Sequence, residues 1–248
     1  MLSRDMLVVV ANKEIFVHDI ARGEMYKRAT FENFFGACDL FSNNKSTLVL
    51  CYPAKEEGAI CIERRDSSHP LITIQAHQSK ISYIALSKDG SLVATSSMTG
   101  TLIRVFDAKT GEKLKDFRRG SHMATIQCVC FSYCCTMLCC TSDTGTLHVW
   151  DLHSENANRT SNLALVNHVV NIEYTTSQWS HAEVKNINSP SLCIFEKNDI
   201  ISVVSSNGMC TKYCLQKNKL KKIDNYGVIW KNINLDFDSE DEWTILDQ

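Results

Sequence analysis

A repeat of about 45 residues is the feature that most constrains the fold of this 248-residue chain. The tetrapeptide TGTL begins at Thr99 and again at Thr144, and each copy leads into a short alternating stretch that ends on aspartate. Matching turn positions recur along the rest of the chain, at Lys13, Gly58, Gly100, Gly145 and Gly208. Short strands and Gly/Thr-rich turns at this period are typical of repeated four-stranded sheets.

The repeat therefore predicts an all-β fold, a β-propeller of WD40-like four-stranded blades. The dipeptide Trp150-Asp151 ends a third strand, where WD repeats often carry it. The strand count predicts an incomplete blade followed by four full ones, near residues 6–32, 36–78, 81–118, 125–187 and 190–225. Such an arc leaves open edges, whereas propellers normally close into a ring. We expect an incomplete propeller over residues 1–230 and a separate tail over 231–248.

Composition excludes several classes of function. The net charge of −2 argues against nucleic-acid binding, although residues 101–122 hold six basic and three acidic residues. No apolar run approaches the ~20 residues that span a bilayer, and the start reads as a strand rather than a signal peptide, so we expect a cytoplasmic protein. The 12 cysteines include no C-x-x-C pair and are expected to be small core residues, without metal. No catalytic set is recognisable, so we expect neither an enzyme nor a cofactor.

The adjacent arginines Arg118 and Arg119 lie at the end of a predicted outermost strand. Because successive strand residues point to opposite faces, each guanidinium should enter a different groove between blades. Their neighbours in the repeat are hydroxyls, a glycine, an arginine and an imidazole, which suit phosphate recognition. Arginine on an outer strand is also a common protection against edge pairing, and that alternative remains open here.

Six motifs follow one another along the chain: GACDLF (36–41), IQAHQSK (74–80), TGTLIRVFD (99–107), FRRG (117–120), TSDTGTLHVW (141–150) and SQWSHAEV (177–184). This ordered set resembles the PROPPIN (WIPI) family of phosphoinositide-binding propellers, and its shorter animal branch in particular. The resemblance implies seven blades, so about five of an expected seven are present and the N-terminal ones are lacking. It also implies recognition of phosphatidylinositol 3-phosphate and the 3,5-bisphosphate at two headgroup sites beside the arginine pair.

Residues are assigned to these sites by their match to the family motifs. The first site comprises Thr95, Ser97, Gly100, Thr101, Arg104 and Arg118, with His77 at its rim. The second site comprises Arg119, Gly120, Ser142, Thr146 and His148. The repeat is 18 residues too long between Gly145 and Gly208, which predicts a long loop at 152–176. The resemblance makes this the membrane-insertion loop, with Leu163, Leu165, Val166, Val169, Val170 and Ile172 as its apolar contacts. These residues could instead cover the blade edge.

The acidic tail ends in a tryptophan, two spacers and a leucine, Trp243 to Leu246. It resembles the short motif that docks onto ubiquitin-like autophagosome modifiers by adding a strand to their sheet. Trp243 and Leu246 would be the anchors, and Asp241 and Glu242 would meet basic rim residues; alternatively, Trp243 packs on the propeller. The resemblance implies a phosphoinositide effector or scaffold in autophagosome formation, peripheral on phagophore, autophagosome or endosomal membranes and bound to autophagy proteins. The alternative is a WD-repeat interaction scaffold without lipid binding.

Overall fold

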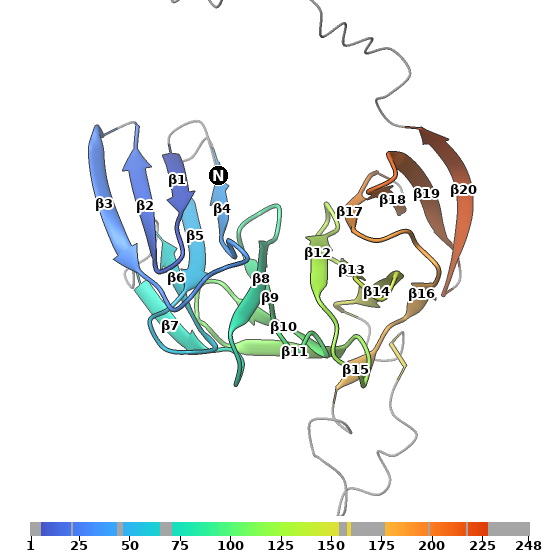
Figure 1. The fold of residues 1–248 in the computed structure, drawn as a ribbon, viewed down its shortest axis with the longest axis horizontal. Helices are drawn as coiled ribbons and strands as arrows, with labels where there is room; N and C mark the ends of the chain where they lie inside the picture. Colours follow the sequence, from blue (N-terminus) through green and yellow to red (C-terminus); the bar gives the residue numbers. More distant parts are fainter. Residues whose placement is uncertain are drawn as a thin grey trace, which may run out of the picture.

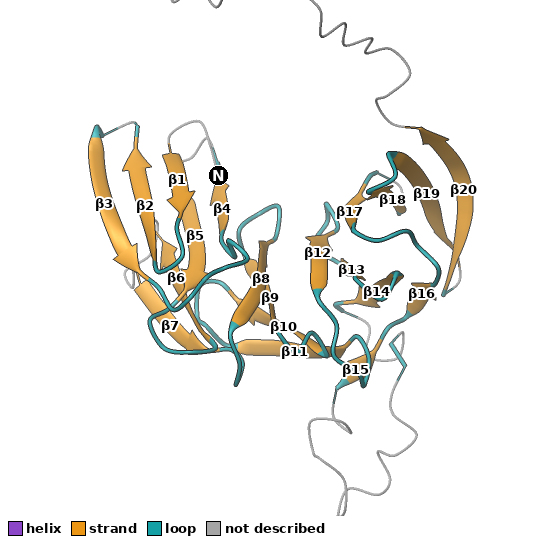
Figure 2. Ribbon diagram, viewed as in Figure 1, coloured by secondary structure: helices purple, strands orange, loops and turns teal. Residues whose placement is uncertain are grey.

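The computed structural model describes residues 6–20, 22–43, 47–64, 71–153, 158–159, 177–197, 199–216 and 218–227. These residues form β-strands joined by turns and loops, arranged as five sheets around an open arc (Figures 1 and 2). We number the sheets first to fifth in chain order. No helix within the described ranges is long and apolar enough to cross a membrane.

Each sheet is built from consecutive strands of the chain, except that β15 joins the third sheet between strands of the fourth. The first contains β1 (Met6–Val10), β2 (Glu14–Asp19) and β3 (Glu24–Ala29), and the second β4 (Asp39–Ser42), β5 (Leu48–Pro53), β6 (Ala59–Arg64) and β7 (Leu71–Gln75). The third contains β8 (Ile81–Leu86), β9 (Leu92–Ser97), β10 (Leu102–Asp107), β11 (Lys113–Arg118) and β15 (Gln178–Trp179). The fourth contains β12 (Ile126–Phe131), β13 (Met137–Ser142), β14 (Thr146–Asp151) and β16 (Ala182–Val184). The fifth contains β17 (Ser191–Phe195), β18 (Ile200–Ser205), β19 (Met209–Gln216) and β20 (Lys219–Gly227).

Within each sheet, consecutive strands pair antiparallel, as in the blades of a propeller. In the fourth sheet Trp150 and Asp151 end β14, the third strand, and the Trp150 side chain is fully buried. The predicted all-β propeller of four-stranded blades, with about five blades present, is confirmed.

The strand β15 was not expected from the sequence, which placed β11 at the perimeter of its blade. β15 pairs in parallel with the end of β11, with Phe117 opposite Gln178 and Arg118 opposite Trp179. The chain then continues into β16, which pairs with β14 as the fourth strand of its own sheet. The third sheet thus gains a strand because the chain passes along its edge before it returns to the fourth sheet.

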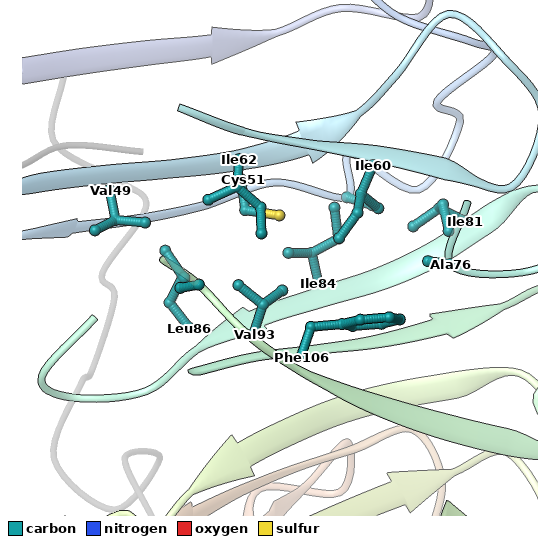
Figure 3. Close-up of a cluster of buried hydrophobic side chains, with 12 residues drawn as sticks. Val49, Cys51, Ile60, Ile62, Ala76, Ile81, Ile84, Leu86, Val93 and Phe106 are labelled. Atoms are coloured by element: carbon teal, nitrogen blue, oxygen red, sulfur yellow. The ribbon is translucent and has the colours of Figure 1, made fainter. Parts of the chain in front are cut away.

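Apolar side chains pack between neighbouring sheets and form the core. At the junction of the second and third sheets, shown in Figure 3, the buried residues include Val49, Cys51, Ile60, Ile62, Ile84, Leu86, Val93 and Phe106. Each fully buried aliphatic side chain contributes about 1.5–3 kcal/mol to stability. Successive residues of a strand point to opposite faces of the sheet. A sheet that lies between two others therefore needs apolar residues at both odd and even positions of its strands. The third sheet packs one face against the second sheet and the other against the fourth.

The turn between β9 and β10 brings the third sheet close to the loop that follows it. Gly100 has a φ of +59°, and a Cβ built there would lie 1.7 Å from the carbonyl oxygen of Ala124. The same contact recurs one repeat later, where a Cβ on Gly145 would lie 2.7 Å from the carbonyl oxygen of Ile187. Glycine at these turns therefore allows the loop between blades to pass directly over the turn.

Candidate functional site

The two arginines of the FRRG motif are buried on opposite sides of the third sheet. Arg118 is the last residue of β11 and lies two residues after Asp116, so both side chains point to the same face of the sheet. This face is turned toward the second sheet, because Arg104, the ion-pair partner of Asp116, donates to the carbonyl of Ala76 just after β7. Arg119 lies just beyond the strand, where its backbone N–H donates to the carbonyl of Thr101 at 2.9 Å. It interacts electrostatically with Cys140 and His148 of the fourth sheet. Both arginines are only 7% exposed.

On the side of the second sheet, three predicted residues lie together. Thr95 of β9 is directly opposite Arg104 of β10. The Thr95 hydroxyl shares a hydrogen bond of 3.0 Å with His77 Nε2. Arg104 Nη1 donates to the carbonyl of Ala76 at 2.7 Å, next to His77 in the chain. Side chains of β9 and β10 and the loop after β7 therefore build this cluster, which we call the first cleft only because it lies at the junction of the second and third sheets.

The charges of the first cleft are partly compensated within the protein. Arg104 Nε donates to the carboxylate of Asp116 at 2.9 Å, and Arg118 Nε donates to the Ser177 hydroxyl at 2.8 Å. Burial, assisted by the positive charge of Arg104, lowers the pKa of His77 to about 3. His77 is therefore a neutral hydrogen-bonding group at physiological pH. Ser97, on the same face of β9 as Thr95, is hydrogen-bonded to the Thr99 hydroxyl at 2.9 Å.

On the opposite side, the second cleft combines Arg119 with side chains of the fourth sheet. Ser142 and Thr146 pair across β13 and β14, and their hydroxyl oxygens are 3.1 Å apart. His148 Nε2 lies 3.1 Å from the Thr146 hydroxyl, and its Nδ1 lies 3.2 Å from the Ser180 hydroxyl. Burial is the main cause that lowers the pKa of His148 to about 4, and the charge of Arg119 acts in the same direction.

Aromatic packing holds the imidazole of the second cleft in place. The rings of His148 and Trp150 are stacked with centroids 5.7 Å apart, and Trp150 stacks in turn on Phe117 at 5.5 Å. Phe117 directly precedes the arginine pair in β11. This stack joins the third and fourth sheets beneath the second cleft, so the position of Arg119 is tied to the core.

The buried guanidinium of Arg119 has neutral hydrogen-bond partners, and the charge of Asp143 also acts on it. Its Nε donates to the carbonyl of Gly100 at 3.0 Å, and its Nη2 donates to the carbonyl of His122. Among the residues that the structure describes, no carboxylate forms an ion pair with Arg119. Burial lowers the pKa of this guanidinium, but an arginine stays protonated in proteins. A bound anion would compensate a charge that carbonyl dipoles only partly stabilise.

The structure distributes the predicted residues differently from the sequence at two positions. Gly100 and Thr101, assigned to the first site, present their carbonyls to Arg119 of the second cleft. Gly120 is half-buried, and no atom lies within 4 Å of a Cβ built on it, so the chain there is open to a ligand. Leu163, Leu165, Val166, Val169, Val170 and Ile172 of the loop lie outside the described residues, as do Asp241, Glu242, Trp243 and Leu246 of the tail.

Sequence reasoning missed three polar residues that contact the clefts, Asp116, Ser177 and Ser180. Asp116 alternates with Arg118 on β11, so the strand period could have identified it. Ser177 and Ser180 belong to the SQWSHAEV segment, far from either cleft in the sequence. Only the parallel pairing of β15 with β11 brings Ser177 to Arg118.

Comparisons with known proteins agree with this architecture. The chain is 34% identical over 171 residues to autophagy-related protein 21 of Pichia angusta, which covers 64% of this chain and 44% of that protein. It is 37% identical over 162 residues to autophagy-related protein 18 of Dictyostelium discoideum, covering 64% of this chain and 43% of that protein. The chain thus spans less than half the length of these curated relatives.

Solved structures show the same fold at lower sequence identity. Kluyveromyces lactis Hsv2p matches 93% of this chain and 73% of its own, with a TM-score of 0.71 and 24% identity. KlAtg21, in a complex with the coiled-coil of AgAtg16, matches 92% of this chain and 69% of its own, with a TM-score of 0.69 and 22% identity. A model of one family, PROPPIN, matches residues 1–215, most of the chain. The protein therefore belongs to the PROPPIN family.

Proposed function

We propose that this protein binds phosphoinositide headgroups in the two clefts beside Arg118 and Arg119 and acts as a membrane-recruited effector in autophagosome formation. The observation that carries the proposal is the buried Arg119 guanidinium, which donates to carbonyl oxygens and forms no ion pair with a carboxylate among the described residues, although the charge of Asp143 acts on it. A phosphate group supplies the missing negative charge and accepts the planar donors of arginine. Membership of the family and the names of the relatives support the autophagic role.

Each cleft offers a different set of donors to a phosphate. The second cleft combines the charge of Arg119 with the hydroxyls of Ser142 and Thr146 and the neutral imidazole of His148. The first cleft combines Arg104 and Arg118 with the hydroxyl of Thr95 and the neutral imidazole of His77. We assign phosphatidylinositol 3-phosphate and the 3,5-bisphosphate to these clefts.

Two clefts on one rim suit edge-on docking to a membrane. Each headgroup contact can be weak, because the second one forms at the high effective concentration set by the first. The apolar residues between 163 and 172 are proposed to insert between lipids as a third anchor. The protein would then lie peripherally on phagophore, autophagosome or endosomal membranes and otherwise in the cytoplasm.

The test is co-sedimentation with vesicles that contain or lack phosphatidylinositol 3-phosphate. We expect the double variant Arg118→Thr and Arg119→Thr to lose the lipid-dependent binding, and each single variant to weaken it. A matched control is Lys221→Thr with Lys222→Thr, an exposed pair on β20 whose loss changes the net charge equally. Circular dichroism and the melting temperature establish that each variant is folded.

The outcomes separate the proposal from a scaffold without lipid binding. If a folded arginine double variant sediments with 3-phosphorylated vesicles as well as the wild type does, the proposed headgroup clefts are wrong. If wild type and control bind equally to vesicles with and without the phosphoinositide, any membrane affinity is general electrostatics. A folded protein that binds neither vesicle supports the scaffold function instead.

We also assign autophagy proteins as partners, including ubiquitin-like autophagosome modifiers at the tail. The sequence Trp243 to Leu246 carries two apolar anchors behind the acidic residues Asp241 and Glu242. We expect Trp243→Ala with Leu246→Ala to abolish capture of such a modifier in a pull-down with purified components. Tyr226→Ala, outside the motif, serves as the control. Equal capture by wild type and tail variant would refute this assignment.

A further inference from the structure

The second cleft continues outward to two cations that the sequence motifs did not assign to it. The Ser180 hydroxyl lies 3.2 Å from His148 Nδ1 and accepts a hydrogen bond of 3.3 Å from Arg159 Nη2. Lys185 lies two residues beyond Glu183 of β16, which is opposite His148 on β14. The side chains of Arg159 and Lys185 are 57% and 69% exposed, so they lie at the solvent end of this cluster. We call these two residues the outer cation pair.

Hydrogen bonds hold Arg159 in its place beside β16. Its Nε donates to the Ser180 carbonyl at 2.9 Å, and its own carbonyl accepts a hydrogen bond of 2.7 Å from the Trp179 backbone N–H. The preceding residue, Asn158, is buried and donates to the Asp151 carbonyl at 2.7 Å. Arg159 is therefore anchored through its backbone and through its guanidinium, which fixes the position of its charge relative to the second cleft.

One carboxylate is shared by the outer cation pair. Glu183 Oε2 lies 3.5 Å from Arg159 Nη2, and Glu183 Oε1 lies 3.8 Å from Lys185 Nζ. Glu183 Oε2 also lies 3.7 Å from His148 Nδ1, but this imidazole is neutral at physiological pH, because burial lowers its pKa to about 4. Two positive charges thus share one negative charge, which leaves a positive excess beside the second cleft.

The imidazole of His148 lies between the outer cation pair and the hydroxyls of the second cleft. Its Nε2 is 3.1 Å from the Thr146 hydroxyl of the cleft, whereas its Nδ1 faces Ser180 and Glu183. Besides burial, the positive charges of Arg119 and of the outer cation pair lower the pKa of this imidazole. Cations therefore act on His148 from the buried end and from the solvent end of the same cluster.

We propose that the outer cation pair binds the 5-phosphate of phosphatidylinositol 3,5-bisphosphate while the 3-phosphate lies at Arg119. This inference rests on the proposed function, and it assigns to the second cleft the discrimination between the two lipids. The 3- and 5-phosphates are attached to alternate carbons of one inositol ring, so a single headgroup presents them to both ends of the cleft.

The charge of the ligand decides which phosphate can bind at the outer cation pair. A phosphate monoester carries a charge of about −1.5 to −2 at pH 7, so it can replace the single charge of the Glu183 carboxylate at both cations. The phosphodiester that joins the headgroup to the lipid carries about one negative charge and has no such advantage over the carboxylate. Phosphatidylinositol 3-phosphate therefore leaves the outer cation pair with Glu183.

The test measures binding of short-chain, water-soluble phosphatidylinositol 3-phosphate and 3,5-bisphosphate by isothermal titration calorimetry. Arg118→Thr is the background, so that the remaining binding reports on the second cleft. There, Arg159→Gln with Lys185→Gln should weaken binding of the bisphosphate about tenfold and that of the monophosphate less than about twofold. Glu183→Gln should strengthen binding of the bisphosphate more than that of the monophosphate, because the carboxylate no longer competes with the 5-phosphate.

Three further variants distinguish a contact with the 5-phosphate from a change of net charge. Arg22→Gln with Lys27→Gln removes two cations of similar exposure that are also ion-paired with carboxylates, and should leave both affinities unchanged. In an Arg119→Thr background the second cleft is disabled, so removal of the outer cation pair should have no further effect on either lipid. Arg159→Lys keeps the charge and should retain most of the discrimination.

The outcomes separate this inference from the proposed function. If the wild type binds both lipids and the folded double variant of the outer cation pair weakens both equally, or neither, the assignment of the 5-phosphate is wrong, whereas the headgroup clefts stand. If the wild type binds neither lipid, the proposed function is wrong and this inference with it. Lys185→Gln alone, at the more exposed cation, decides the result should the double variant melt at a lower temperature.

Discussion

The two buried histidines, His77 and His148, are kept neutral by the same arrangement that buries the arginines. Burial and the nearby guanidinium charges lower the pKa of His77 to about 3 and that of His148 to about 4. Each imidazole keeps a lone pair and one N–H for hydrogen bonds to hydroxyls. At neutral pH these residues therefore orient hydroxyl groups in the clefts without adding positive charge.

This depression of the histidine pKa predicts a loss of stability in mild acid. In the unfolded chain a histidine binds its proton near pH 6.5, whereas the folded protein resists protonation down to about pH 4. Stability is therefore complete above pH 6.5 and falls as the pH decreases, by roughly 2 kcal/mol per histidine at pH 5. Urea unfolding at pH 7 and pH 5 measures this loss.

The histidine variants provide the control for that measurement. His77→Gln and His148→Gln retain hydrogen-bonding groups but do not titrate, so each should show a smaller decrease between pH 7 and pH 5. Most surface carboxylates stay ionised in this interval and contribute little to the difference. If both variants lose as much stability as the wild type, the histidines are not the source of the acid sensitivity.

At the scale of the elements, the turns determine how closely one blade follows the next. The β9–β10 turn touches the loop after β11, where Gly100 lies against the Ala124 carbonyl. The same turn presents its carbonyls to Arg119, so the packing of the turn also positions the second cleft. The repeated TGTL motif is thus both a structural turn and a part of the candidate site.

Gly100→Ala should destabilise the protein by more than the usual cost of a left-handed residue. The conformation alone costs about 1–3 kcal/mol, and the new Cβ would also force the Ala124 loop to move. Gly36→Ala is the matched control, because Gly36 has a φ of +65° and no atom within 4 Å of a built Cβ. Thermal or urea unfolding of both variants separates the contact from the conformation. Equal losses of unfolding free energy in the two variants would mean that the loop at Ala124 moves aside without a measurable cost.

Over the described residues the sheets form an open arc in which neighbouring sheets pack face to face through four clusters of apolar side chains. The proposed lipid clefts lie on the two sides of the third sheet, in the middle of this arc, where packing on both faces fixes the arginines.

The sequence determined the repeat, the fold class and the opposite directions of Arg118 and Arg119. These properties are local, because a period of 45 residues and a strand pleat of two can be read along the chain. The repeat also placed Thr95 beside Arg104 and Ser142 beside Thr146, since each pair spans one β-turn. The period alone did not decide whether the arginines bind phosphate or protect an edge strand, and the resemblance to the family favoured phosphate binding.

Only the tertiary structure decided which charges are compensated and what lies outside β11. Ser177 reaches Arg118 because β15 runs along the edge of the third sheet. The two residues are 59 positions apart in the sequence, which does not match the repeat, so the period could not predict their hydrogen bond. Arg119 is left with carbonyl partners because the turn at Gly100 and the loop at His122 converge on it. Burial and charge compensation depend on segments that meet from several repeats, so the sequence could identify the candidate residues but not their electrostatic state.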